Sequence, residues 1–167
     1  MSHLYHATPY DISASGFYFS THEEYAAKAA THCNAYGQHV EEYEIQFIDG
    51  EHPELFEALG INQANLADWF EHFEDMDNDD AVVAIYLITD RDLAINEIIR
   101  SLNDVMLFHG TVVEYAEDYL DQSGMLDQIP EAIRRYIDVE AFARDLVLGG
   151  DVTAFEVDGT SYVVEAH

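Results

Sequence analysis

The sequence feature that most constrains the fold is a long acidic stretch without a cation. Residues 29–90 contain no Lys and no Arg but carry fifteen Asp and Glu residues. Apolar residues such as Ile45, Trp69 and Phe73 lie between these acids. A disordered acidic tail would lack such core-forming residues. The stretch is therefore predicted to fold while its negative charge stays unneutralised, which costs stability through self-repulsion.

Composition extends the same conclusion to the whole chain. It has 34 acids against 6 bases, a net charge of -28, and 49% apolar residues, enough to form a core. Such a protein is repelled by DNA, RNA and anionic membranes, so its expected partners are basic protein surfaces. The single cysteine, Cys33, allows no internal disulfide and suits a reducing compartment. No signal peptide is recognised, and the longest apolar run, residues 81–88, is too short to span a bilayer. The expected location is the cytoplasm.

Hydrophobic patterning predicts an α+β protein made of a row of three small lobes. Residues 1–50 are expected to form a small sheet with one helix. The strands are predicted at residues 3–8, 17–19 and 40–48, the last alternating apolar and acidic side chains. Thr21 is placed to cap the helix, which is expected to reach about residue 32.

Residues 51–104 are predicted to form an acidic helical lobe. A short helix over 52–59 ends at Gly60, and the next helix buries the apolar positions Leu66, Trp69, Phe70 and Phe73. The run over residues 81–88 is interpreted as a helix, because four Asp and Asn residues before it, 77–80, resemble an N-cap and an acidic first turn. Thr89 and Asp92 resemble a capping box, which predicts a further helix through about Leu102.

Residues 105–167 are predicted to form a mixed C-terminal lobe. Thr111 and Glu114 form a capping box for a helix that Gly124 ends. The remaining elements are expected to be a strand over 105–109, a short helix begun by Pro130, a helix capped by Asp138 and a hairpin turning at Asp158-Gly159.

Several chemistries are poorly supported. The histidines show no zinc-ligand spacing, and the acidic segment over residues 75–79 lacks the Gly and Glu of a calcium loop. No phosphate loop, nucleophile elbow or Cys/His motif is present. The sequence therefore predicts no catalytic residue, no metal site and no cofactor, although a chain this acidic can pair carboxylates in ways that sequence does not reveal.

The acidic helix faces indicate a function more specifically than any catalytic or metal-binding pattern does. Exposed helices usually mix signs, because oppositely charged neighbours stabilise them. Here the acids have no cation in their own helices. The net charge of the whole chain, -28, matches that of about 50 Å of duplex DNA. We interpret these acids as a DNA-mimic surface. Its predicted carboxylates are Asp68, Glu71, Glu74, Asp75, Asp79, Asp80, Glu114, Glu117, Asp118 and Asp121.

Composition and charge are also compatible with three alternatives to a DNA mimic. The chain could be a halophile-type acidic domain, which would unfold at low salt. It could be an acidic adaptor that binds another basic protein without imitating DNA. It could also be an enzyme with an unrecognised carboxylate site.

The C-terminal third resembles the ArdA antirestriction family over about residues 111–148. The similarity rests on a helix ending in Gly124 and on a Pro-started helix followed by a Tyr-Ile-Asp segment. The motif positions are Pro130, Tyr136, Ile137, Asp138, Phe142, Arg144, Asp145 and Leu146. Phe142 replaces the usual Tyr of the family, and Ala143 replaces a Gly.

The resemblance implies an elongated three-lobed protein that imitates bent B-form DNA and forms a homodimer through its C-terminal lobe. It implies no enzymatic activity. It also implies that the protein occupies the DNA-binding groove of type I restriction–modification enzymes, which protects an incoming mobile genetic element such as a plasmid, transposon or phage.

Overall fold

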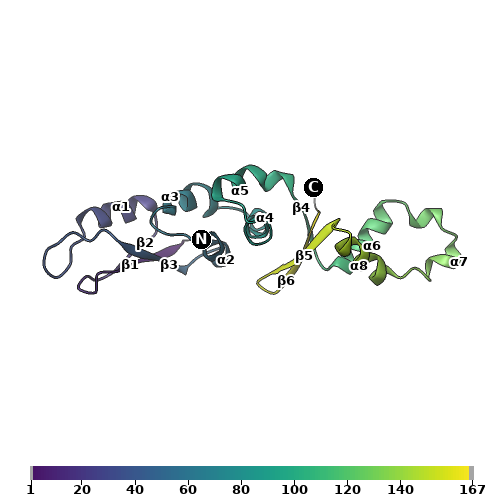
Figure 1. The fold of residues 1–167 in the computed structure, drawn as a ribbon, viewed down its shortest axis with the longest axis horizontal. Helices are drawn as coiled ribbons and strands as arrows, with labels where there is room; N and C mark the ends of the chain where they lie inside the picture. The colour runs from purple at the N-terminus through teal and green to yellow at the C-terminus, as the bar shows by residue number, and fades with distance from the viewer. Residues whose placement is uncertain (1, 166–167) are drawn as a thin grey trace. The chain divides into compact units, whose positions relative to one another are not determined.

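The structure, a computed structural model, describes residues 2–165 and has the predicted α+β class (Figure 1). Along the chain, helices lie between the strands of two antiparallel sheets, each of three strands. The chain divides into two compact units, Met1–Ile99 and Arg100–His167, each with its own sheet. The division into three lobes at residues 50 and 104 stays a prediction. No helix among the described residues has the length and hydrophobicity needed to cross a membrane.

The first unit begins with a sheet of strand order β2-β1-β3. Its strands are β1 (Leu4–Pro9), β2 (Phe17–Phe19) and β3 (Tyr43–Asp49). The alternation predicted for β3 is confirmed, because Tyr43 and Ile45 are buried while Glu44 and Gln46 are exposed. Helix α1 (His22–Thr31) starts at the predicted cap, where the Thr21 hydroxyl accepts a hydrogen bond from the Glu24 amide.

Helices complete the first unit. They are α2 (Pro53–Leu59), α3 (Leu66–Asp68), the π-helical turn η1 (Trp69–Phe73), α4 (Asn78–Thr89) and the start of α5 (Ile95–Ser101), which ends in the second unit. Leu66, Trp69 and Phe73 are fully buried, as their spacing predicts, and Phe70 is half-buried. The predicted cap of α4 is also confirmed, because the Asp77 side chain accepts a hydrogen bond from the Asp80 amide.

The capping box predicted at Thr89 and Asp92 is wrong. Thr89 is the last residue of α4, and its hydroxyl donates a hydrogen bond to the Ile85 carbonyl at 2.8 Å. An N-cap needs extended backbone, whereas Thr89 continues the helix begun by the apolar run before it. Helix α5 starts later, at Ile95, where the Glu97 side chain accepts a hydrogen bond from the Ala94 amide.

The second unit contains a sheet of strand order β4-β6-β5 and three helices. The strands are β4 (Met106–His109), β5 (Val152–Val157) and β6 (Thr160–Glu165). The helices are α6 (Val112–Gln122), α7 (Glu131–Arg134) and α8 (Val139–Leu148). The 3-10 turn η2 (Leu102–Asp104) precedes β4, and the 3-10 turn η3 (Leu126–Gln128) lies between α6 and α7.

The predicted hairpin is confirmed with its register, because Val157 pairs with Thr160 and Phe155 with Tyr162. Asp158 and Gly159 both have positive φ, as a two-residue hairpin turn requires. The adjacent core contains Tyr115 of α6 together with Val152 and Val163 of the sheet. This core fixes α6 to the sheet by one face and leaves its other face to solvent.

Candidate functional site

Helix α6 has the clearest acidic face. Tyr115, Ala116 and Leu120 are buried, whereas Glu114, Glu117, Asp118 and Asp121 are exposed. The helix contains no Lys or Arg. Residues three and four apart on a helix are neighbours, with Cβ atoms about 5–6 Å apart. The face is therefore a closely spaced group of carboxylates.

The four carboxylates of α6 are not equivalent. Glu114 closes the predicted capping box: its side chain accepts a hydrogen bond from the Thr111 amide at 2.9 Å, and its own amide donates to the Thr111 hydroxyl at 3.2 Å. Asp118 accepts from the Gln122 side-chain amide. Glu114 thus stabilises the helix end as well as carrying charge.

Glu117 and Asp121 also border a pocket of about 260 Å³. Its lining is otherwise mainly apolar and includes Leu120 and Ile137. Arg134 lies at the same pocket, where its Nε donates to the Ile129 carbonyl at 3.0 Å. Long cationic side chains bury their apolar stems and keep the charged head at an edge. The chain's own Arg134 therefore supplies the cation beside the two carboxylates at this pocket.

The acids of the first unit are placed less uniformly. Glu71, Asp75 and Asp79 are exposed, whereas Asp68 and Asp80 are half-buried. Burial raises the pKa of the Asp80 carboxyl, and the neighbouring Asp77 and Asp79 raise it further. Asp79 and Asp80 lie in the first turn of α4, where the helix dipole favours negative charge. These two acids thus also have a structural reason for their position.

Glu74 differs from the expectation that it belongs to the exposed acidic face. Its side chain is only 13% exposed, and its Oε1 lies 3.2 Å from Nδ1 of the buried His3. The Tyr5 hydroxyl donates to Glu74 at 3.2 Å and accepts a hydrogen bond from the Trp69 indole at 2.7 Å. Burial raises the pKa of the Glu74 carboxyl, and the nearby His3 opposes this rise. Glu74 therefore serves the core of the first unit and does not belong to the exposed acidic face.

Sequence reasoning missed this buried group, although part of its signal was present. Glu74 follows Phe70 by four residues, so it lies on the same inward stripe of the helix. Nothing in the sequence pairs it with His3, because that contact joins the first strand to the end of η1.

The family motif residues are mainly structural. Pro130 precedes α7, and the Asp138 side chain caps α8 by accepting from the Ala141 amide at 3.0 Å. Phe142 packs near the Tyr119 ring, and Leu146 packs on the core beside Tyr115. The other motif positions vary in exposure: Ile137 is half-buried, whereas Tyr136, Arg144 and Asp145 are exposed.

Two cations form ion pairs with acids outside the predicted set. Lys28 contacts Glu24 at 2.8 Å within α1, and Arg134 lies 3.9 Å from Asp127. Neither acid belongs to the predicted surface. Within residues 2–165, no group of three or more His, Cys, Asp or Glu residues is arranged to hold a metal ion.

Comparison with known proteins supplies the family. A family model described as antirestriction protein (ArdA) matches residues 10–160. No curated protein matches the chain. The match extends far beyond the 111–148 segment in which the resemblance is visible by eye, and it includes most of both compact units. The chain therefore belongs to the ArdA family of antirestriction proteins.

Proposed function

We propose that this protein is a DNA mimic that occupies the DNA-binding groove of type I restriction–modification enzymes and inhibits them competitively. The observation that carries the proposal is the exposed acidic face of α6, a helix without Lys or Arg of its own, in a chain of the antirestriction family. We further propose that it acts in the cytoplasm, where it protects a mobile genetic element.

The mechanism replaces phosphates with carboxylates. Lys and Arg side chains that line a DNA-binding groove form charge-assisted hydrogen bonds with either kind of oxyanion. On α6 the exposed carboxylates of Glu117, Asp118 and Asp121 are available for such contacts. No catalytic residue is required.

The remaining acids of the proposed surface lie in the first unit. They are Asp68, Glu71, Asp75, Asp79 and Asp80. Because the charge is spread over many positions, each carboxylate contributes little alone, as is usual for exposed ion pairs. Inhibition is then a property of the whole set.

We also propose a homodimer formed through the second unit. Large apolar side chains are exposed around α7 and α8, among them Ile133, Tyr136 and Leu148. Homodimer interfaces are more apolar than the rest of a protein surface. Pairing two copies through these side chains would remove them from water.

The decisive experiment is a competition between this protein and duplex DNA for a purified type I enzyme. We expect the protein to displace DNA, and we expect its affinity to fall steeply as salt is raised, as for DNA itself. Binding that leaves DNA in place would indicate an acidic adaptor instead. A circular dichroism spectrum at low salt tests halophilic adaptation, since a halophilic domain would unfold there.

A further inference from the structure

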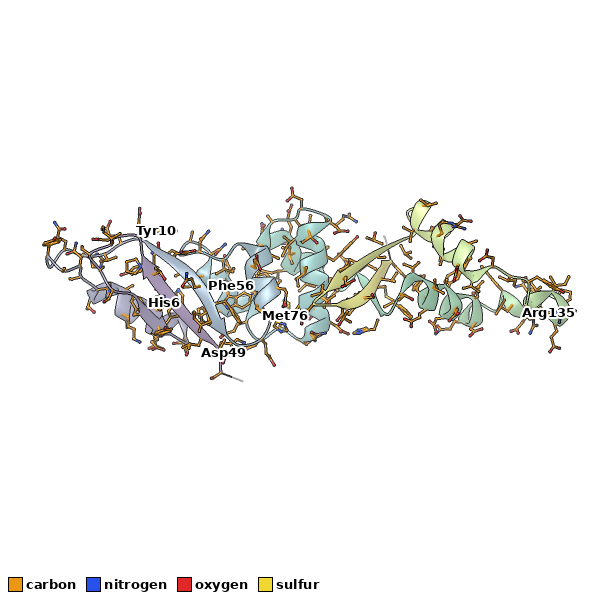
Figure 2. All side chains as sticks on the ribbon, turned by 90° about the horizontal axis from the view of Figure 1, so that it is seen from below. His6, Tyr10, Asp49, Phe56, Met76 and Arg135 are labelled. Carbon is orange, nitrogen blue, oxygen red and sulfur yellow. The ribbon has the colours of Figure 1, made fainter. Side chains whose placement is uncertain are left out.

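Two loops at one end of the first unit carry large apolar side chains outward. One is residues 10–16, which joins β1 to β2, and the other is residues 33–39, which follows α1 (Figure 1). Ile12 is fully exposed, Tyr36 is 80% exposed and Tyr10 is 65% exposed. Figure 2 shows Tyr10 at the margin of the unit with its side chain turned outward. We call these two loops the apolar tip.

Hydrogen bonds tie the two loops of the apolar tip together. The Ala35 amide donates to the Ser13 carbonyl at 3.0 Å, and the Asn34 side-chain amide donates to the Asp11 carboxylate at 2.8 Å. Asp11 accepts in addition from the Ser13 amide and hydroxyl.

The second loop is also fixed internally. The Asn34 side chain accepts from the amides of Tyr36 and Gln38, and Gly37 between them has a φ of 77°. The exposed rings thus stand on an ordered base, which lowers the entropic cost of binding through them.

The apolar tip is also where the acidic surface stops. Residues 1–40 hold only three of the 34 acids, and within residues 8–18 and 29–40 the one charged side chain is Asp11. Hydrogen bonds from Ser13 and Asn34 hold the pKa of Asp11 below its usual value and occupy its oxygens. Asp11 therefore stays ionised, and it is the single carboxylate that these segments offer to a groove lined by Lys and Arg.

The tip nevertheless adjoins acids. The Tyr10 amide donates to the Glu42 carbonyl at 3.2 Å, and both Glu42 and Glu44 are exposed along the start of β3. A partner that meets this end of the unit therefore needs a basic face and, next to it, an uncharged apolar face.

We propose that the apolar tip is a second contact with the restriction enzyme, in which Tyr10, Ile12 and Tyr36 pack on an apolar protein surface beside the basic groove. The proposal rests on the proposed function, because it takes the same enzyme as partner. Rigid aromatic side chains on ordered loops are typical anchors of protein interfaces. The carboxylates then speed encounter, and the tip slows dissociation.

The test compares wild type with a variant carrying Tyr10→Ser, Ile12→Ser and Tyr36→Ser. A matched control replaces two exposed apolar residues of the same sheet outside the tip, Tyr18→Ser and Ile48→Ser. Thermal melting checks that both variants stay folded. Binding to the type I enzyme is measured as association and dissociation rates at several salt concentrations, with and without competing duplex DNA.

We expect the tip variant to dissociate about a hundredfold faster, because a few anchor residues carry most of the binding energy of an interface. Its salt dependence should equal that of wild type, because no charge has changed, and the control should bind normally. Unchanged dissociation of the tip variant overturns the proposal. So does a change in the sedimentation of the free tip variant, which would assign the tip to a contact between two copies.

Failure of the proposed function gives a different result. Wild type would then bind without displacing DNA, and the dissociation rate of the tip variant would still support or overturn the tip contact. If wild type does not bind the enzyme, both proposals are refuted.

Discussion

At the scale of single residues, Glu74 shows that a carboxylate in a very acidic chain can serve the fold instead of the surface. It lies at the end of a hydrogen-bonded chain that runs from the Trp69 indole through the Tyr5 hydroxyl. His3 flanks the same carboxylate, and its Nε2 is buried with no hydrogen-bond partner among residues 2–165. Gly50 makes room for this ring, because a Cβ at that position would lie 2.3 Å from the His3 side chain.

The raised pKa of Glu74 predicts a contribution to the pH dependence of stability. A carboxyl whose pKa is higher in the folded state binds more protons there, so the free energy of unfolding falls as pH rises from about 4.5 through the raised value. Glu74→Gln removes this contribution. We expect the difference between wild type and Glu74→Gln, measured by urea denaturation, to become less favourable to wild type as pH rises across this range.

Glu71→Gln is the matched control for this measurement, because Glu71 lies three residues away and is exposed. Its difference from wild type should stay nearly constant with pH. A constant difference for Glu74→Gln as well would contradict the role of burial.

Tyr5 gives a second prediction about the same group. Tyr5→Phe keeps the ring, which is fully buried, but leaves the Trp69 indole N–H without its partner. An unsatisfied buried donor costs about 1–3 kcal/mol. We expect Tyr5→Phe to lower the free energy of unfolding by that amount in urea denaturation. Tyr36→Phe, which removes an exposed hydroxyl, should leave stability unchanged, and equal effects would show that the Tyr5 hydroxyl is not structurally important.

At the scale of elements, α6 separates two uses of acid on one helix. Glu114 stabilises the N-terminus through the capping box, whereas Glu117, Asp118 and Asp121 lie beyond it on the exposed face. Like charges three and four apart destabilise a helix slightly. The burial of Tyr115 and Leu120 against the rest of the second unit offsets that cost.

This division predicts the outcome of charge reversal on α6. Replacing Glu117, Asp118 and Asp121 together by Lys should weaken inhibition of a type I enzyme about a hundredfold. A single replacement should weaken it by less than about tenfold, because each exposed pair contributes about 0.2–1 kcal/mol. The measurement is the inhibition constant for DNA cleavage in vitro.

The control carries the same change of charge at Glu51, Glu54 and Glu57, which are exposed on or near α2 and lie outside the proposed surface and the proposed dimer contact. It should inhibit nearly as wild type does. Equal losses in the two triple variants would mean that net charge matters and the position of α6 does not. Equal losses for one and three replacements on α6 would contradict a distributed surface.

At the scale of the whole molecule, each of the two units has its own group of exposed apolar side chains. In the second unit Ile133 and Tyr136 are exposed near α7, and the Arg135 guanidinium lies 5.1 Å from the centre of the Tyr136 ring. In the first unit the exposed apolar side chains include those of the apolar tip. We assign the former to the proposed dimer and the latter to the proposed enzyme contact.

The dimer proposal predicts that Ile133→Asp with Tyr136→Asp yields a monomer in sedimentation velocity at micromolar concentration. Two buried carboxylates cannot be accommodated in an apolar interface without large cost. Ile48→Asp, which changes an exposed residue of β3 in the first unit, should leave the dimer intact. A monomeric wild type would refute the dimer, and a dimeric double variant would place the interface elsewhere.

Much of the local structure is predictable because it depends on short-range physics. The caps at Thr21, Asp77, Thr111 and Asp138 are all confirmed, since each joins a side chain to an amide three residues on. The hairpin at Asp158-Gly159 is confirmed for the same reason. The capping box predicted at Thr89 is wrong because the same residue types can occur at the end of a helix as at its start. Only the structure shows that Thr89 still belongs to α4.

The sequence by itself determined the acidity, the α+β class and the family, since charge, periodicity and motif are written along the chain. Tertiary structure alone decided which acids reach solvent and which apolar residues do. It placed Glu74 against His3 across 71 residues of sequence and brought two charge-poor loops together as the apolar tip. The reason is physical: charge belongs to a residue, whereas exposure depends on what the rest of the chain packs around it.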